Sequence, residues 1–346
     1  MTNNTLVLVD GSYYLFRAYH AMPPLTNSSG EPTGVIFGVI NMIKKHLTEG
    51  GPDYFAVIFD AKGKTFRNNL YEEYKANRPE MAEELAVQIK PLHELIQALG
   101  IPLLVIDGVE ADDVIATLAI EAAKKNIKTI ISTGDKDLAQ IVNKDIHLIN
   151  TMSNLKLDPS GVKDKFGVPP ERIIDYLTLV GDSVDNIPGV PKVGPKTAAK
   201  WLNEFGSLEQ IVKNVDKIKG KVGENLRKFL PKIPLTKELV TLKCDVELTV
   251  SPEDLIIAEA DSDLLGKIYA RWNFTSWLTQ LNQEDNEEEN KKSQIKRSSD
   301  SCKPKYETIY KVSELDNWLD KLKNAKLISI DTETTSLDYM TAKIVG

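Results

Sequence analysis

Acidic residues stand at or just after the ends of four apolar runs, 5–10, 54–60, 101–107 and 127–133, and two more lie in the later segment "GDSVDN". One acid at a helix start caps free N–H groups and meets the positive end of the helix dipole. Several acids close together repel one another, so capping alone does not explain the pattern. The nine acids are Asp10, Asp60, Glu110, Asp112, Asp113, Asp135, Asp137, Asp182 and Asp185.

Carboxylate oxygens favour hard cations, Mg²⁺ with Mn²⁺ as a substitute, and the sequence has no Cys/His cluster with zinc-ligand spacing. A divalent cation would also offset the repulsion between the acids. Two such ions roughly 4 Å apart are a standard arrangement for in-line attack on a phosphodiester. The acids therefore predict a metal-dependent phosphoryl-transfer site.

Strands and helices alternate over the first 150 residues. Apolar runs predict buried strands at 5–10, 54–60, 101–107, 127–133 and 145–150, and apolar periodicity predicts helices at 81–99 and 111–125. Pro91 is expected to kink the first helix. This alternation predicts an α/β fold with a mainly parallel central sheet and helices on both faces. Such sheets bind ligands at the carboxyl ends of their strands, where the acids stand.

Helices dominate from about 159 to 280, and there the charge reverses. Residues 192–243 hold twelve Lys/Arg against five Asp/Glu, a net charge of +7 in a chain of net charge −7. Within this part, "IPGVPKVGPKTA" predicts a hairpin between helices. Its Gly189 and Gly194 would let the backbone approach a DNA phosphate, with charge added by Lys192, Lys196 and Lys200. The alternative is a plain turn with solvated lysines.

The segment 63–81 lies between the second strand and the next helix. Tyr71, Tyr74, Lys75 and Arg78 recur there at spacings of three and four, as on one helix face. Aromatic rings with cations suit single-stranded nucleic acid, which they bind by stacking and phosphate contact. The alternative is an amphipathic surface helix whose tyrosines pack in the core.

Composition limits the remaining possibilities. The chain has 346 residues, 42% hydrophobic and 27% charged, as in soluble proteins of two or more domains. No apolar run could span a bilayer, the start shows no signal peptide, and two cysteines fit a reducing cytoplasm. Residues 282–304 are almost entirely polar and predict a flexible linker.

Five blocks in order, "LVDGSYYLFRAYHA", "FDAKGKTFR", "GVEADDVIATLA", "ISTGDKDLAQ" and "GDSVDNIPGVPKVGPKTA", resemble the 5′-nuclease domain of bacterial DNA polymerase I, of the flap endonuclease family. The resemblance covers about 1–280. It implies a PIN/FEN-like α/β nuclease domain at 1–165, with a helical arch near 63–81. A helical DNA-binding domain with a helix–three-turn–helix would follow at 166–281.

The resemblance also assigns roles to residues. It implies two metal ions, one held by Asp10, Asp60, Glu110, Asp112 and Asp113, the other by Asp135, Asp137, Asp182 and Asp185. Tyr74, Lys75 and Arg78 match the arch through which a single-stranded 5′ end passes, and the two cations would steer the scissile phosphate. Implied DNA contacts are Arg17, Gly189, Val190, Lys192, Val193, Gly194, Lys196, Thr197 and Lys200, with a K⁺ ion at the hairpin.

The implied activity is that of a structure-selective 5′–3′ exonuclease and 5′-flap endonuclease for RNA primer removal and DNA repair, without polymerase activity. The implied partners are a flapped or primer-bearing duplex, with a separately encoded polymerase and ligase in the pathway, and the chain would be a monomer. Two other classes remain: a non-catalytic DNA-junction binder, and a phosphatase with an aspartyl nucleophile. The phosphatase commonly needs Asp-x-Asp after the first strand, where this chain has Ser12 in the second acid's place.

The end of the chain carries a second resemblance. "LISIDTETTSLD" (327–338) is similar to the first motif of a 3′–5′ proofreading exonuclease, in which Asp331 and Glu333 would be metal ligands. The further carboxylates and strands of such a domain do not follow. We therefore expect residues 305–346 to be an inactive remnant, since roughly 40 residues bury too little surface to fold alone.

Overall fold

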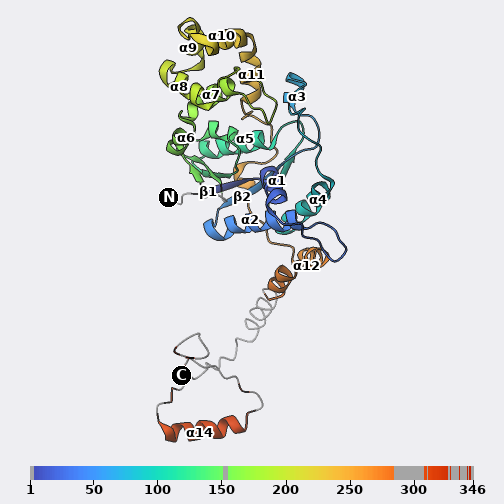
Figure 1. The fold of residues 1–346 in the computed structure, drawn as a ribbon. Helices are drawn as coiled ribbons and strands as arrows, with labels where there is room; N and C mark the ends of the chain where they lie inside the picture. The colour runs from blue at the N-terminus through green and yellow to red at the C-terminus, as the bar shows by residue number, and fades with distance from the viewer. Residues whose placement is uncertain are drawn as a thin grey trace. The chain divides into compact units, whose positions relative to one another are not determined.

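The computed structural model describes residues 4–150, 155–283, 308–309, 311–325 and the single positions 328, 335, 341 and 343. The chain divides into two units, Met1–Glu284 and Asp285–Gly346 (Figure 1). In the second unit the structure describes the helix α14 (Val312–Lys323). Nearly all of the predicted linker, together with Asp331 and Glu333, lies outside the described residues.

The first unit is built on one sheet with the strand order β3-β2-β1-β4-β5-β6. All neighbouring strands are parallel except β5 and β6. The five predicted strands are confirmed with ends shifted by at most two residues, whereas the three-residue β6 is too short to give a periodic signal. The strands are β1 (Thr5–Asp10), β2 (Tyr54–Asp60), β3 (Leu103–Ile106), β4 (Lys128–Ser132), β5 (Ile146–Asn150) and β6 (Leu155–Leu157).

Alternating side chains of the strands feed two cores. Leu6 and Leu8 of β1 belong to the core that contains α5 (Ala111–Lys124), whereas Val7 and Val9 belong to the opposite core. That second core is closed by α1 (Gly11–Ala21), α2 (Gly34–Gly50), α4 (Glu83–Ala98) and α12 (Ser262–Arg271). In Figure 1, α5 lies on one side of the sheet, and α2 and α4 lie on the other. The predicted sheet with helices on both faces is confirmed.

The second part of this unit is helical, as predicted. Short 3₁₀ turns lie between its helices: η2 (Pro170–Arg172), η3 (Val215–Lys217), η4 (Leu230–Lys232) and η5 (Pro252–Asp254). A further 3₁₀ turn, η1 (Asp137–Ile141), lies between β4 and β5. Among the described helices, none is long and apolar enough to cross a membrane. The helices are α6 (Pro159–Phe166), α7 (Ile173–Val180), α8 (Pro195–Phe205), α9 (Leu208–Lys213), α10 (Gly220–Phe229) and α11 (Ile233–Val240), and residues 275–283 are also helical.

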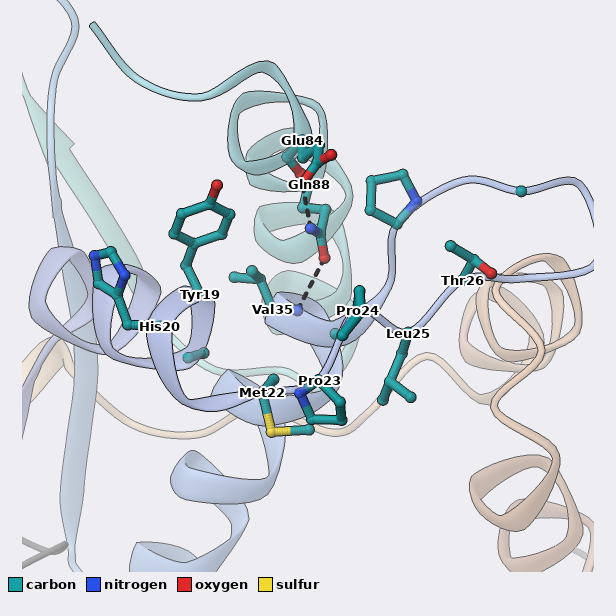
Figure 2. Close-up of a pocket in the computed structure, with 14 residues that line it drawn as sticks. Tyr19, His20, Met22, Pro23, Pro24, Leu25, Thr26, Val35, Glu84 and Gln88 are labelled. Carbon is teal, nitrogen blue, oxygen red and sulfur yellow. Dashed lines mark hydrogen bonds between the residues drawn. The ribbon is translucent and has the colours of Figure 1, made fainter. Parts of the chain in front are cut away.

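A buried glutamine joins α4 to the start of α2. Thr33 precedes α2 but makes no side-chain cap. Instead the Gln88 Oε1 accepts hydrogen bonds from the N–H groups of Val35 (3.0 Å) and Ile36 (3.4 Å), and its Nε2 donates to the Glu84 carbonyl (2.8 Å). Figure 2 shows this amide beside a pocket of about 480 Å³ that the end of α1 and the loop 22–33 also line. Gln88 therefore does the work of an N-cap from another helix.

Gln88→Leu should lower the free energy of unfolding by about 1–3 kcal/mol, because two buried N–H groups would lose their acceptor. Urea unfolding followed by circular dichroism measures the change. Gln97→Leu is the matched control, since Gln97 is exposed on the same helix. Equal losses in the two variants would contradict this role.

Candidate metal and nucleic-acid site

Two of the predicted acids end neighbouring parallel strands. Asp10 ends β1 and caps α1, where its Oδ1 accepts from the Tyr13 N–H (2.8 Å) and its Oδ2 accepts from the Thr133 hydroxyl (2.7 Å). Asp60 ends β2, and its Oδ1 accepts from the Ala111 N–H (2.9 Å) at the start of α5. Strand pairing and helix capping therefore bring the ends of β1 and β2 and the start of α5 to one edge of the sheet.

One cavity of about 770 Å³ opens at this edge. Lys75 and Arg78 also line it, as do side chains of α1 that include Phe16 and Tyr19. The structure thus brings together residues that the sequence separates by up to 175 positions. Six of the nine predicted acids line the cavity: Asp10, Asp60, Glu110, Asp112, Asp135 and Asp185.

Burial of like charges dominates the electrostatics of this edge. Burial, with the charges of Asp60 and Asp135 adding to it, raises the pKa of Asp10 to about 7. Burial and the neighbouring Asp135 hold the pKa of Asp112 well above its ordinary value. Among the described residues, no hydrogen bond reaches the Asp112 carboxylate. Nearby, Asp137 has a raised pKa of the same origin, and its buried Oδ1 lacks a hydrogen-bond partner among the described residues.

These features fit a divalent cation. The donors are all oxygens, their charges repel, and one buried oxygen is unsatisfied. Within the described part of the chain, no three of these groups form a finished metal cage. Instead cations of the protein pair with four of the acids: Lys75 with Glu110, Arg78 with Asp185, Lys136 with Asp182 at 2.8 Å, and Arg67 with Asp113 at 2.7 Å.

Metal-free protein should lose stability as the pH rises from 5.5 to 7.5. An ordinary aspartate has lost its proton by the start of this range, whereas the raised pKa of Asp10 keeps its proton bound in the folded state up to pH about 7. Deprotonation then costs folding free energy, about 2 kcal/mol for this group between pH 5.5 and 7.5. Urea unfolding in EDTA at the two pH values tests this, and equal or greater stability at pH 7.5 would contradict it.

The segment 71–78 differs from the expected helix. It forms consecutive turns after α3 (Phe66–Leu70), and Lys75 has a left-handed backbone with φ 57°. The Lys75 N–H donates to the Asp185 carbonyl (3.0 Å), which a continuing helix would not allow. Tyr74 is 3% exposed, and its hydroxyl donates to Glu110 Oε2 (2.9 Å). Tyr74, Lys75 and Arg78 therefore face the acids, but from turns rather than from one helix face.

Asp113 does not lie where a metal ligand is expected. It is 0% exposed, and both its oxygens are already used. Oδ1 accepts from Arg67 (2.8 Å) and the Lys243 N–H (2.9 Å), while Oδ2 accepts from Arg67 (2.7 Å) and the Glu110 N–H (3.1 Å). The carboxylate is also absent from the cavity wall. The structure thus places Asp113 in an ion pair at the start of α5, outside the cavity wall on which the other four acids of its predicted metal group lie.

The predicted DNA-binding hairpin joins α7 to α8. Lys192, Lys196 and Lys200 are exposed, whereas Val190 and Val193 are buried and could offer only their backbone. A Cβ at Gly189 would clash with the Val180 carbonyl at 2.1 Å, so close packing requires glycine there. A Cβ at Gly194 would meet open space, which leaves the start of α8 accessible. Thr197 is partly exposed near this start, and Arg17 lies exposed on α1.

Two residues that support the site were not predicted to be site residues. Arg67 is 2% exposed and contacts both Glu110 and Asp113. The Asp60 N–H donates to the Ser12 hydroxyl (2.9 Å), which joins β2 to the start of α1. Both lie within blocks that resemble the nuclease family, but neither has a spacing that marks it.

Two family models match the chain in succession. Residues 5–167 match the 5′–3′ exonuclease N-terminal resolvase-like domain, and residues 168–263 match the 5′–3′ exonuclease C-terminal SAM fold. Among solved structures, T5 5′-exonuclease with bound zinc aligns with a TM-score of 0.60 at 23% identity, over 69% of this chain and 90% of that one. The catalytic core of Rad2 in complex with DNA substrate aligns with a TM-score of 0.54 at 18% identity, over 82% of this chain and 91% of that one. At these identities the likeness shows the fold.

Relatives agree with the family models. The chain is 47% identical over its whole length to DNA polymerase I of Pseudomonas aeruginosa, of which it spans 39%. It is 41% identical to the 5′–3′ exonuclease of Buchnera aphidicola subsp. Baizongia pistaciae, over 81% of this chain and 95% of the relative. The 5′–3′ exonuclease of Aquifex aeolicus is 42% identical, over 75% of this chain and 89% of the relative. The chain therefore belongs to the 5′–3′ exonuclease family.

Proposed function

We propose that this chain is a Mg²⁺-dependent, structure-selective 5′ nuclease that hydrolyses phosphodiester bonds where a single-stranded 5′ end leaves a duplex. The observation that carries the proposal is one cavity whose wall holds six of the nine predicted acids beside Lys75 and Arg78. A flap or an RNA primer end would enter this cavity.

The acids divide into two groups that would hold the ions. Asp10, Asp60, Glu110 and Asp112 stand at the ends of β1 and β2 and the start of α5, and we assign them to one ion. Asp135, Asp137, Asp182 and Asp185 would hold the second, with Mn²⁺ as a substitute for Mg²⁺. When bound, such ions lower the pKa of an attacking water and neutralise charge on the departing oxygen.

Three residues of the turn segment would act on the substrate phosphate and on Glu110. The Tyr74 hydroxyl holds the Glu110 carboxylate and so fixes its direction. Lys75 and Arg78 stand on the cavity wall, in ion pairs with Glu110 and Asp185. Once the acids are neutralised by other cations, both side chains are free to contact the scissile phosphate and hold it in line.

The helical part would hold the duplex. Its open start of α8 and three exposed lysines suit phosphate contacts that position DNA without reading its sequence. A K⁺ ion at the hairpin, bound by backbone carbonyls, and a DNA contact from Arg17 belong to the same proposal. The proposal also includes that the chain is a monomer and that it takes part in primer removal beside a separate polymerase and ligase.

A labelled substrate tests the function. A duplex with a labelled 5′ flap is incubated with the chain and Mg²⁺, and products are resolved by length. We expect cleavage near the junction that EDTA abolishes, and loss of cleavage with retained DNA binding in Asp112→Asn. Binding of the flap duplex without any metal-dependent cleavage would instead favour a non-catalytic junction binder.

The three hairpin lysines should contribute to affinity rather than to chemistry. Replacing Lys192, Lys196 and Lys200 together by alanine should weaken duplex binding about 10- to 100-fold and reduce the slope of log affinity against log salt by about 3. The single-turnover rate at saturating DNA should hardly change. Alanine at the exposed Lys90, Lys144 and Lys267 is the matched control. An unchanged salt slope would count against the hairpin as the duplex-binding surface.

A further inference from the structure

Arg67 of α3 is a buried cation that contacts Glu110, one of the acids of the cavity wall. A guanidinium has five N–H donors, and here all five are used. Nε donates to the Leu239 carbonyl (3.0 Å) and Nη2 to the Thr241 carbonyl (3.1 Å). Nη1 donates to Glu110 Oε2 (3.2 Å), and the two Nη atoms together bind Asp113 (2.7 and 2.8 Å). One side chain thus connects α3, α5 and the end of α11.

The pair of Arg67 with Asp113 is closed to any further ligand. Each oxygen of Asp113 accepts two hydrogen bonds, and the residue has no exposed surface. A metal ion could reach this carboxylate only by displacing the guanidinium. Asp113 therefore acts on Arg67, whose planar fork it holds in a bidentate pair.

Glu110 is the acid that this pair leaves directed to the cavity. Its Oε2 is held by Arg67 and by the Tyr74 hydroxyl, while its Oε1 contacts Lys75 on the cavity side. The charges of Arg67 and Asp113 cancel, so the cluster retains the negative charge of Glu110. A buried pair of this kind contributes little net stability over an apolar pair, but it fixes geometry.

We propose that Arg67 is a positioning residue for the nuclease reaction: held by Asp113, it fixes the Glu110 carboxylate towards the metal-binding edge and ties that edge to the backbone of 239–241 in the helical part. The proposal rests on the proposed function. Partners that orient a ligating carboxylate are worth about 10- to 100-fold in metal affinity or activity.

Two variants test the role. Arg67→Lys keeps the charge but cannot reproduce the fork or reach both carbonyls. Asp113→Asn keeps the shape and removes the charge that orients Arg67. Arg227→Lys is the matched control, because Arg227 also donates to backbone carbonyls, those of Val215 and Ile218 on the helical part. Each protein is assayed for thermal melting, flap-DNA affinity, single-turnover cleavage and Mn²⁺ binding by calorimetry.

Arg67→Lys and Asp113→Asn should cleave about 10- to 100-fold more slowly at saturating DNA and bind Mn²⁺ more weakly, with flap affinity within about threefold of wild type. The number of Mn²⁺ ions bound per chain should stay unchanged in Asp113→Asn. Loss of one ion in that variant would overturn the proposal, because Asp113 would then be a ligand itself. Wild-type rates and Mn²⁺ affinity in both variants would also overturn it.

Folding and the proposed function are separated by the same measurements. If one of the two variants fails to fold at 25 °C, the cleavage rate and Mn²⁺ affinity of the other variant test the proposal. Failure of both would contradict the proposal, since the cluster would then serve stability alone. If the wild-type chain does not cleave the flap, the proposed function fails, while the Mn²⁺ affinities still report on Arg67.

Discussion

Asp112→Asn should slow cleavage about a thousandfold and at the same time stabilise the metal-free protein. Its carboxylate lines the cavity beside the other acids, and no hydrogen bond from the described residues compensates its charge. Without this carboxylate, a metal ion would stabilise the negative charge of the transition state less well, by several kcal/mol. We therefore expect a rate loss of about a thousandfold. The effect on folding has the opposite sign.

The direction of the stability change follows from the raised pKa of Asp112. Burial and like charges hold the pKa of Asp112 above its ordinary value, so the ionised form is less favourable in the folded chain than in the unfolded chain. At neutral pH that form costs stability, and the neutral asparagine removes the cost. We expect the free energy of unfolding in EDTA to rise by about 1 kcal/mol.

Single-turnover cleavage and urea unfolding measure the two effects on the same preparation. Asp164→Asn is the matched control, because Asp164 is an exposed acid of α6 outside the cavity. The control should change neither quantity. An Asp112→Asn variant that is less stable than wild type in EDTA would show that the acid is held by contacts rather than tolerated for chemistry.

The sheet and its acidic edge could be predicted because each rests on a local signal. β1 and β2 are apolar runs of six and seven residues that end in an aspartate, and the described strands have those bounds. Parallel pairing then places Asp10 and Asp60 at one edge without any knowledge of side-chain packing. The same holds for the hairpin, whose glycines and prolines mark the break between α7 and α8.

The separate roles of Glu110 and Asp113 could not be predicted, because they depend on residues distant in the sequence. Both acids precede or begin the same helix, and only the fold brings Arg67 from 43 positions before Glu110 and the Lys243 N–H from 130 positions after Asp113. From the sequence alone, Glu110, Asp112 and Asp113 were therefore given the same predicted role as metal ligands. One of them caps and anchors, as base rates for helix starts favour, and the others face the cavity.

The helix face predicted for 71–78 was wrong for a similar reason, because the conformation of this segment depends on a residue distant in the sequence. Its spacing of three and four fits a helix, but the left-handed backbone of Lys75 and its hydrogen bond to the Asp185 carbonyl fix a turn instead. Asp185 lies 110 positions later in the chain. Tertiary contact with the acidic edge thus overrides a local pattern.

Lys75→Met should tighten metal binding while it slows cleavage. In the described structure, Lys75 pairs with Glu110 and lies 3.8 Å from Asp185, so a cation of the protein occupies carboxylates that we assign to metal ions. A metal must displace this ammonium before it can use Glu110. Methionine keeps the apolar stem over the Tyr74 ring but cannot compete. We expect Mn²⁺ affinity to rise by about threefold to tenfold, because one charge-assisted contact is worth about 1 kcal/mol here.

Cleavage should respond in the opposite direction. The same ammonium is the group that we expect on the scissile phosphate, and its loss should reduce the single-turnover rate by about a hundredfold. Calorimetry with Mn²⁺ and flap cleavage at saturating metal separate the two effects. Lys125→Met is the control, because Lys125 pairs with Glu253 away from the cavity. A metal affinity that falls in Lys75→Met would mean that Lys75 orients Glu110 for the ion instead of competing with it.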